Sequence, residues 1–199
     1  MVESDSKGVD PRIRRSRILL QEALARLLKK KTFEEVSIQD VAEEATVNRA
    51  TFYAHYPDKY ALLECMTASR FQELLDERGV TFDGTCNTAL RLILLGICDY
   101  LETTLETQCD KERAMDPHVE SAITGVVRQM ILLGLKKDPW IGAISEEIVA
   151  ATVSWALYGA AKEWLRTPNR VPADAISNDV TQIVFPLLQP VSAGQNLKG

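Results

Sequence analysis

A short polar segment near residue 50 carries the side chains of this sequence that are best suited to contact nucleotides. Within eight residues it brings together an amide, a guanidinium, a hydroxyl, a phenol and an imidazole, from Asn48, Arg49, Thr51, Tyr53 and His55. Such groups hydrogen-bond to base edges in the major groove and to phosphate oxygens. The spacing predicts that these side chains and Ala50 lie outward, while Ala45, Val47, Phe52 and Tyr56 point toward a core.

Two short helices joined by a turn are predicted to position this segment. Ser37-Ile38-Gln39-Asp40 is a capping-box pattern, so a helix is expected to begin there. Thr46-Val47-Asn48 predicts a turn, and a second short helix should end near Tyr56 because Pro57 restricts the residue before it. Asp58 should cap a long helix reaching about Arg78. A helix-turn-helix at about residues 37–56 follows from these signals.

Helical periodicity runs through nearly the whole chain, and the expected fold class is all-α with about nine helices. A first helix at about 12–29 should bury Ile13, Leu20 and Leu24, among others. Later helices are expected at about 85–109, 117–137, 144–166 and 173–189. The predicted organisation is a frayed tail at 1–10, a DNA-binding domain at 11–57, a helical effector-binding and dimerisation domain at 58–190, and a second tail at 191–199.

The charge is unevenly distributed along the 199 residues. The net charge is −5, yet residues 10–31 hold eight Lys/Arg against two acidic residues, which gives +6. From residue 61 onward, 12 basic and 18 acidic residues give −6. A basic leading segment joined to an acidic body suits a protein whose one end meets a polyanion.

The sequence offers few of the residues that other classes of function would need. Cys65, Cys86, Cys98 and Cys109 form no C-x-x-C pair, so neither a zinc site nor a disulfide scaffold is expected, and buried thiols are favoured over a redox sensor. A helical enzyme is disfavoured because there is no glycine-rich phosphate loop, no Ser-His-acid set and no metal-ligand cluster. We therefore expect no cofactor, no metal and no enzymatic activity. Without an apolar run long enough to span a bilayer, the expected location is cytoplasmic.

The segment 12–63 resembles the TetR/AcrR family of bacterial transcriptional regulators. Ser37 to Ala45, followed by Thr51-Phe52-Tyr53-Ala54-His55-Tyr56-Pro57-Asp58-Lys59-Tyr60-Ala61-Leu62-Leu63, carries the resemblance. Thr46 departs from the glycine usual in the family's turn, which predicts a turn that avoids positive φ. Ala50 stands where glycine or another small residue is common.

The resemblance implies roles for these residues. Arg49, Ala50 and Thr51 would face the major groove, Tyr53 and His55 would touch the phosphate backbone, and Lys59 would hold a phosphate. The full predicted DNA-binding set is Ser37, Thr46, Asn48, Arg49, Ala50, Thr51, Tyr53, His55 and Lys59. The alternatives are that Tyr53 and His55 form a packed aromatic cluster and that Arg49 is merely a solvated charge.

The rest of the chain resembles the family in architecture, which implies a homodimer on near-palindromic double-stranded operator DNA, with recognition helices about 34–36 Å apart. The predicted dimer interface comprises Trp155, Tyr158, Gly159, Lys162, Trp164 and Ile183; an intramolecular core helix is the alternative. A pocket for a small apolar or amphiphilic effector would draw on Phe82, Ile97, Tyr100, Leu101, Met115, His118, Met130 and Trp140, residues that could equally be core. The expected function is a repressor released by that effector. The alternatives are an effector-independent DNA-binding architectural factor and a body that binds a protein partner.

Overall fold

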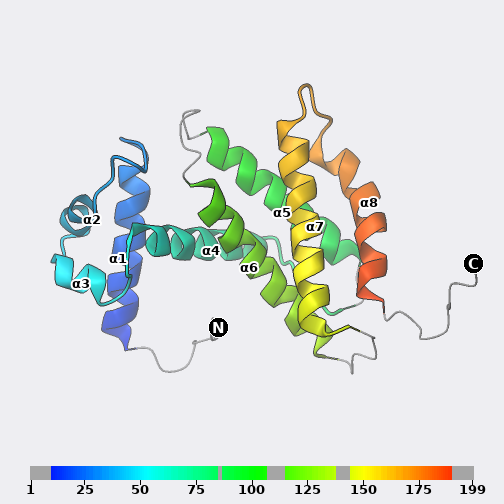
Figure 1. Ribbon diagram of the computed structural model, residues 1–199, viewed down its shortest axis with the longest axis horizontal. Helices are drawn as coiled ribbons and strands as arrows, with labels where there is room; N and C mark the ends of the chain where they lie inside the picture. Colours follow the sequence, from blue (N-terminus) through cyan, green and yellow to red (C-terminus); the bar gives the residue numbers. More distant parts are fainter. Residues whose placement is uncertain (1–9, 85–86, 107–114, 138–143, 190–199) are drawn as a thin grey trace, which may run out of the picture. The chain divides into compact units, whose positions relative to one another are not determined.

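The structure is a computed structural model that describes residues 10–84, 87–106, 115–137 and 144–189. Every regular element in these ranges is helical (Figure 1), as the periodicity predicts. The elements are α1 (Pro11–Leu27), α2 (Ile38–Glu44), α3 (Arg49–Tyr53), α4 (Lys59–Glu77), α5 (Asn87–Glu106), α6 (Asp116–Leu135), α7 (Glu146–Arg166), α8 (Ala173–Val184) and the 3-10 helix η1 (Phe185–Leu188). None of the described helices combines the length and hydropathy needed to cross a bilayer.

The chain forms two compact units. The first comprises Met1–Thr67 with Thr107–Val119, and the second comprises Ala68–Glu106 with Glu120–Gly199. Helices α1, α2 and α3 lie in the first unit, and α5, α7 and α8 lie in the second. The chain crosses from one unit to the other within α4 and again within α6.

Local signals decide where the helices of the first unit begin. Asp10 accepts a hydrogen bond from the Arg12 amide at 2.9 Å, and Pro11 at the first helical position donates no hydrogen there. The Ser37 Oγ accepts from the Asp40 amide at 3.1 Å while Asp40 Oδ2 accepts from the Ser37 amide at 2.7 Å, so the predicted capping box is confirmed. Asp58 Oδ1 accepts from the Ala61 amide at 2.8 Å and starts α4.

The core of the first unit is built from apolar residues at helical spacing. Leu20, Ala23, Leu24 and Leu27 are the buried residues of α1, and they are joined by Phe33, Val36, Val41, Ala42, Ala45, Phe52, Tyr56, Leu62, Leu63 and Met66. Ile13 was predicted to be buried, but it is 43% exposed. The buried residues of α1 begin at Leu20, so the first two turns extend past the core.

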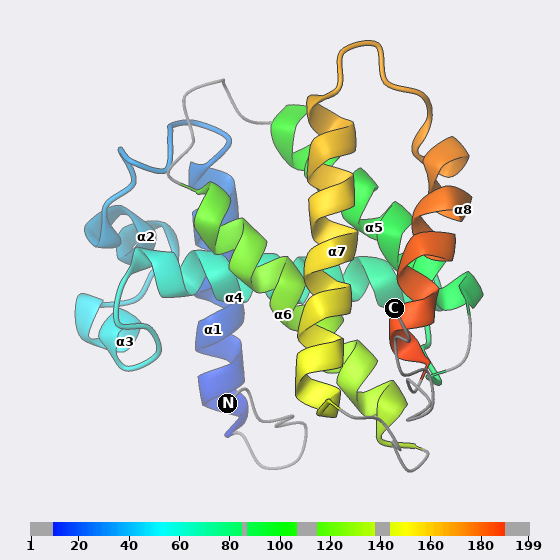
Figure 2. The same cartoon turned by 45° about the vertical axis from the view of Figure 1, so that its right-hand side comes forward.

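In the second unit, α5 contacts both α7 and α8, and α7 contacts α8 (Figure 2). The buried side chains include Leu90, Ile93, Leu94 and Ile97 of α5 and Val149, Val153 and Leu157 of α7. Gly134 permits one close approach, because a Cβ there would lie 2.3 Å from Phe82 Cδ1. The predicted helix at 173–189 divides into α8 and η1.

The turn between α2 and α3 differs from the expectation. Thr46 has φ 58°, so the prediction that this turn avoids positive φ is wrong. The Val47 amide donates to Ala42 O at 2.9 Å and the Thr46 amide donates to Glu43 O at 3.0 Å. This is the Schellman pattern, which requires a left-handed residue after the helix cap. The need to satisfy the last carbonyls of α2 therefore overrides the preference of a β-branched residue.

Thr46→Gly should raise stability. A left-handed conformation destabilises the folded protein by about 1–2 kcal/mol at a non-glycine residue, and glycine removes this cost. Glycine also has greater conformational entropy in the unfolded chain, which offsets about 0.5–1 kcal/mol of the gain. We expect a net gain of roughly 0.5–1 kcal/mol, or roughly 2 °C in Tm by scanning calorimetry. The control is Thr81→Gly. Thr81 is an exposed threonine without a positive φ, so this substitution should only add entropy to the unfolded chain and lower Tm. If Thr46→Gly lowers Tm as much as the control does, the left-handed conformation of Thr46 does not destabilise the protein.

Candidate nucleic-acid interface

Helix α3 is five residues long, and neighbouring groups hold it in place. Asn48 Oδ1 accepts from the Thr51 amide at 2.7 Å and from the Thr51 hydroxyl at 3.0 Å, which caps the helix. Phe52 is completely buried and forms an edge contact with Tyr53, their ring centroids 5.6 Å apart. One face of α3 is thus fixed in the core. Its N-terminal turn is left facing outward.

The outward face matches most of the predicted DNA-binding set. Thr46, Asn48, Arg49, Ala50 and Tyr53 are exposed. The Arg49 guanidinium donates to the Tyr53 hydroxyl at 3.3 Å and lies 5.8 Å from the centre of its ring. No carboxylate pairs with Arg49 among the described residues, so its guanidinium group is available to an anionic ligand. Thr51 and His55 are half-buried beside this surface.

Tyr56 anchors the residues that follow α3 against α1. Its ring is buried, its centroid lies 5.7 Å from the Arg17 guanidinium carbon, and its hydroxyl accepts from Gln21 Nε2 at 3.4 Å. Burial raises the pKa of Tyr56. The hydrogen bond to Tyr56 in turn raises the pKa of Arg17 against the opposing effect of burial. These contacts fix the C-terminal side of α3 to the N-terminal half of α1.

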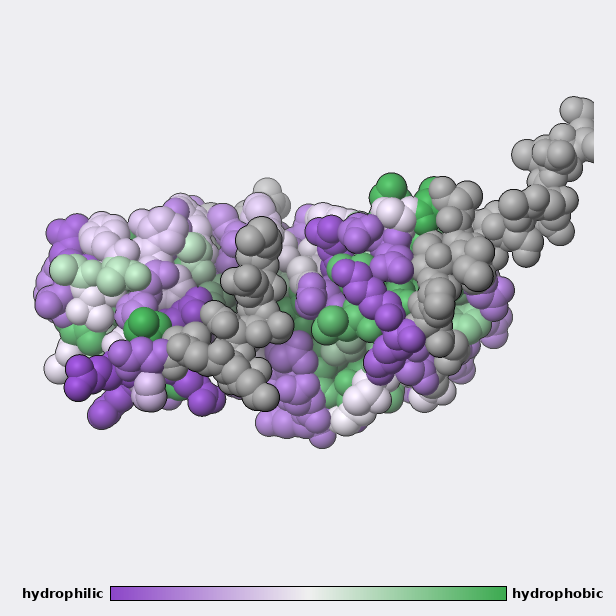
Figure 3. Space-filling view, turned by 90° about the horizontal axis from the view of Figure 1, so that it is seen from below, coloured by the Kyte–Doolittle hydropathy of each residue, from purple (hydrophilic) through white to green (hydrophobic). Residues whose placement is uncertain are grey.

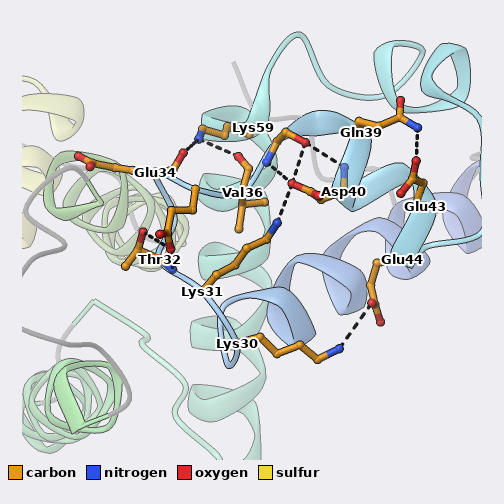
Figure 4. Close-up of polar contacts among 12 residues, drawn as sticks. Lys30, Lys31, Thr32, Glu34, Val36, Gln39, Asp40, Glu43, Glu44 and Lys59 are labelled. Carbon is orange, nitrogen blue, oxygen red and sulfur yellow. Dashed lines mark hydrogen bonds and ion pairs between the residues drawn. The ribbon is translucent and has the colours of Figure 1, made fainter.

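Ion pairs join α2 to the last turn of α1 and to the turn that follows it, and Figure 4 shows those of Lys30 with Glu44 and of Lys31 with Asp40. Arg26 Nε lies 2.6 Å from Glu44 Oε1, and Lys31 Nζ lies 2.8 Å from Asp40 Oδ2. The contact with Lys31, followed by the hydrogen bonds from Ser37, holds the pKa of Asp40 far below its ordinary value. The Ser37 hydroxyl itself donates to Asp40 Oδ2 at 2.7 Å. Ser37, predicted to contact DNA, thus already uses its hydroxyl in the capping box.

Lys59 has a structural contact that the sequence did not reveal. Its Nζ donates to the carbonyl oxygens of Phe33 at 2.8 Å, Glu34 at 3.1 Å and Val36 at 2.8 Å, and it lies 4.8 Å from the centre of the Phe33 ring (Figure 4). An ammonium group has three hydrogens to donate, and three carbonyls accept here. Burial lowers the pKa of Lys59 despite the nearby charge of Glu34. Lys59 thus fastens the turn that leads into α2, and its expected role as a phosphate holder stays a prediction.

The residues of the predicted effector pocket are divided between the two units. Phe82, Ile97, Leu101 and Met115 are buried, and Phe82 packs on Gly134. Met115 and His118 belong to the first unit, where His118 Nδ1 lies 2.7 Å from Glu64 Oε1 and its ring stacks on Tyr60. Trp140 lies outside the described residues. Met130 is half-buried. Tyr100 lines a hollow of the second unit together with Arg70, Glu77 and Arg78.

The predicted dimer residues separate into two groups. Trp155, Gly159 and Ile183 are exposed, with Trp155 at 52% and Ile183 at 75%. Tyr158 and Trp164 are buried in their own chain, and the Trp164 indole donates to Val171 O at 2.7 Å. Lys162 pairs with Glu120 at 2.5 Å. Tyr158, Lys162 and Trp164 thus make contacts within their own chain, and their place in a dimer interface stays a prediction.

Cys65 and Cys98, the two cysteines among the described residues, are free thiols. Cys98 is buried, and desolvation raises its pKa to about 12. Cys65 is half-buried and accepts a hydrogen bond from Gln21 at 3.3 Å. Cys86 and Cys109 lie outside the described residues. A thiol with so high a pKa as Cys98 is poorly reactive, which suits the expectation of a buried core cysteine.

Comparison with known proteins gives one match to a family and several similar folds. Residues 20–66 match the family model of the bacterial regulatory proteins, tetR family. An uncharacterized HTH-type transcriptional regulator of Bacillus subtilis (strain 168), YxbF, is 35% identical over 71 residues, which make up 35% of this chain and 19% of that protein. The match thus spans about a fifth of the length of this curated relative.

Two solved structures are similar over most of the chain. Lin0861 from Listeria innocua has a TM-score of 0.60 at 24% identity and covers 92% of this chain and 95% of its own. A TetR transcriptional regulator from Streptococcus agalactiae 2603V has a TM-score of 0.51 at 20% identity and covers 87% and 95%. At these identities the similarity is one of fold.

Proposed function

We propose that this chain is a member of the tetR family of bacterial regulatory proteins, whose model residues 20–66 match, and that it is a homodimeric repressor that binds operator DNA through α3. The observation that carries the proposal is the outward N-terminal turn of α3, where Arg49 lies exposed beside Ala50 and Tyr53 with no carboxylate partner in the described chain. A short helix with a buried C-terminal side and a polar, cationic N-terminal turn can enter the major groove with that turn against the bases.

A second copy of the chain would supply the other half of the interface with DNA. One α3 reads only a few base pairs, so the proposal needs two recognition helices one turn of DNA apart. The exposed residues Ile148, Thr152, Trp155 and Gly159 recur every three or four positions along α7 and so share one face. Ile183 of α8 and Leu187 of η1 are also exposed apolar side chains. We propose that α7, α8 and η1 together form the dimer interface.

The proposed effector site is a hollow of about 570 Å³ in the second unit. It is lined by Arg70, Glu73, Leu74, Glu77, Arg78, Asp99, Tyr100, Glu102 and Thr103. Arg78 pairs with Asp99, and Arg170 pairs with Glu102 from outside this set. Four carboxylates against two guanidinium groups, beside a leucine and a tyrosine ring, suit an amphiphilic cation better than an apolar molecule. Binding of such a molecule would release DNA if it favours a state with lower affinity for the operator.

Selection of bound duplexes from a random pool tests the proposed function. The wild-type chain should enrich an inverted repeat whose half-sites are related by about one helical turn, or 34–36 Å. Arg49→Ala should bind the enriched duplex and a scrambled one with nearly equal affinity, a loss of about 1–3 kcal/mol in discrimination. The control is Arg166→Ala, an exposed arginine at the end of α7. No enrichment by the wild type, or unchanged discrimination by Arg49→Ala, would exclude this function for α3.

Trp155→Glu should dissociate the dimer. A glutamate at the centre of an apolar interface must lose its hydration without a partner, which is strongly unfavourable. Sedimentation should show the mass falling from twice 22.2 kDa to the single-chain value. Leu133→Glu is the matched control, because Leu133 of α6 is 55% exposed but lies outside the proposed interface. Dimers that persist in Trp155→Glu with the same dissociation constant as the control would refute this interface.

Release of the enriched duplex tests the effector site. Decyltrimethylammonium, kept below its micelle concentration, should lower the anisotropy of labelled duplex bound to the wild type, whereas decanoate of equal chain length should not. Glu73→Gln with Glu77→Gln should weaken the response about tenfold, because two carboxylates of the hollow lose their charge. Circular dichroism should show that the protein stays folded. Equal responses to the two amphiphiles, or none, would favour the effector-independent DNA-binding alternative.

A further inference from the structure

The lysines and arginines of the first unit differ in whether their charge is already used. Arg26 and Lys30 pair with Glu44, Lys31 pairs with Asp40, and Lys59 donates to three carbonyls. Arg17 lies over the Tyr56 ring and donates to its neighbour Cys65 at 3.9 Å. These cations therefore have partners within the chain, which join α1, α2 and the turn between them.

A second group of cations has no such partner. Arg12, Arg14 and Arg15, all in the first turns of α1, are exposed, and no described carboxylate lies within ion-pair distance of them. The nearest acidic residue in sequence is Asp10, whose side chain accepts from the Arg12 backbone amide and caps the helix. The end of the helix is thus already capped, and the unused groups are the guanidinium groups themselves.

These arginines fan around the end of α1. Successive helical residues are about 100° apart, so Arg14 projects away from Arg12 and Arg15, which are neighbours on one side. A projecting end can present cations on all sides only if nothing packs on it, and every residue from Pro11 to Arg15 is exposed. Three long, flexible guanidinium side chains on such an end can reach several successive phosphates.

The end that carries the arginines is the one beside α3. Figures 1 and 2 both show α3 next to the N-terminal half of α1, and α2 next to its C-terminal half. The contact of Arg17 with Tyr56 and that of Arg26 with Glu44 agree with this arrangement. The view from below looks onto the N-terminal end of α1, where hydrophilic residues predominate (Figure 3). A duplex lying along α3 would therefore pass close to the arginine cluster.

We infer that Arg12, Arg14 and Arg15 form a second DNA contact, which binds the phosphate backbone without regard to sequence, and that Lys59 does not bind phosphate. This rests on the proposed function of α3. The cluster supplies affinity and salt dependence, whereas Arg49 and its neighbours supply discrimination. Lys59 is a positioning residue: it fixes the turn at residues 33–36, and so the start of α2, from which α3 is held.

The test compares variants in anisotropy titrations over a series of KCl concentrations, with the enriched duplex and a scrambled duplex of equal length. The triple variant R12A/R14A/R15A should bind both duplexes more weakly by the same factor, roughly a hundredfold at 0.15 M salt, and should reduce the salt slope by about 2.7. R128A/K136A/K137A changes the net charge equally through exposed residues in and just after α6, and should leave the slope unchanged.

Lys59→Met and Lys59→Arg test the second half of the inference. Both should lower Tm, because neither a thioether nor a planar guanidinium can donate to three converging carbonyls, and neither should change the salt slope of the folded protein. If Lys59 holds a phosphate, Lys59→Met will reduce the slope by about 0.9 and Lys59→Arg will restore it.

The outcomes separate the two proposals. If the wild type enriches no duplex and shows no salt-dependent binding, the proposed function itself is wrong. If the wild type binds normally but R12A/R14A/R15A keeps the full slope, only the arginine contact is wrong. A slope that falls equally in the α6 triple variant would mean that net charge rather than position matters, which would also overturn the inference.

Discussion

The burial of Phe52 is the constraint on which the first unit depends. A helix of five residues gains too few hydrogen bonds to exist alone, because helix initiation is unfavourable. Phe52 holds α3 against the core, and Asn48 satisfies its first amides. With one side fixed in this way, Arg49, Ala50 and Tyr53 can only lie outward. The chemistry of the surface thus follows from a packing requirement that concerns a different residue.

The lysines and arginines of the first unit fall into two groups: some contact partners within the chain, and others are available to a ligand. The pairs of Arg26 with Glu44 and of Lys31 with Asp40 hold α2 on α1, and Lys59 holds the turn between them. Exposed pairs of this kind contribute little stability one by one. Their joint effect is to define the position of α2 and, through the turn at Thr46, that of α3. Arg12, Arg14, Arg15 and Arg49, which have no ion-pair partner among the described residues, lie on the side that faces the duplex in our account.

Local signals made much of the fold predictable, and distant contacts explain the failures. The capping box at Ser37 and the cap at Asp58 depend on residues within four positions of one another, and the structure contains both. The predicted helix end near Tyr56 is wrong, because α3 already ends at Tyr53, ahead of Pro57. Lys59 donates hydrogen bonds to carbonyls 23 to 26 residues earlier in the chain, and no local sequence pattern predicts that contact. Thr46 takes a left-handed conformation because α2 must close its last turn there. On α7, periodicity identifies a stripe but does not say which side meets the chain's own core, so Trp155 and Trp164 were grouped together although they face opposite environments.

Hydrogen exchange of the protein with and without the enriched duplex tests the central claim most directly, because it reports on backbone amides without altering any residue. Amides of residues 48–54 should exchange more slowly by tenfold or more in the complex, while those of residues 133–137 at the end of α6 should exchange at the same rate as in the protein alone. If the amides of α3 exchange equally fast in both states while the duplex remains bound, α3 does not lie against DNA and the account is wrong.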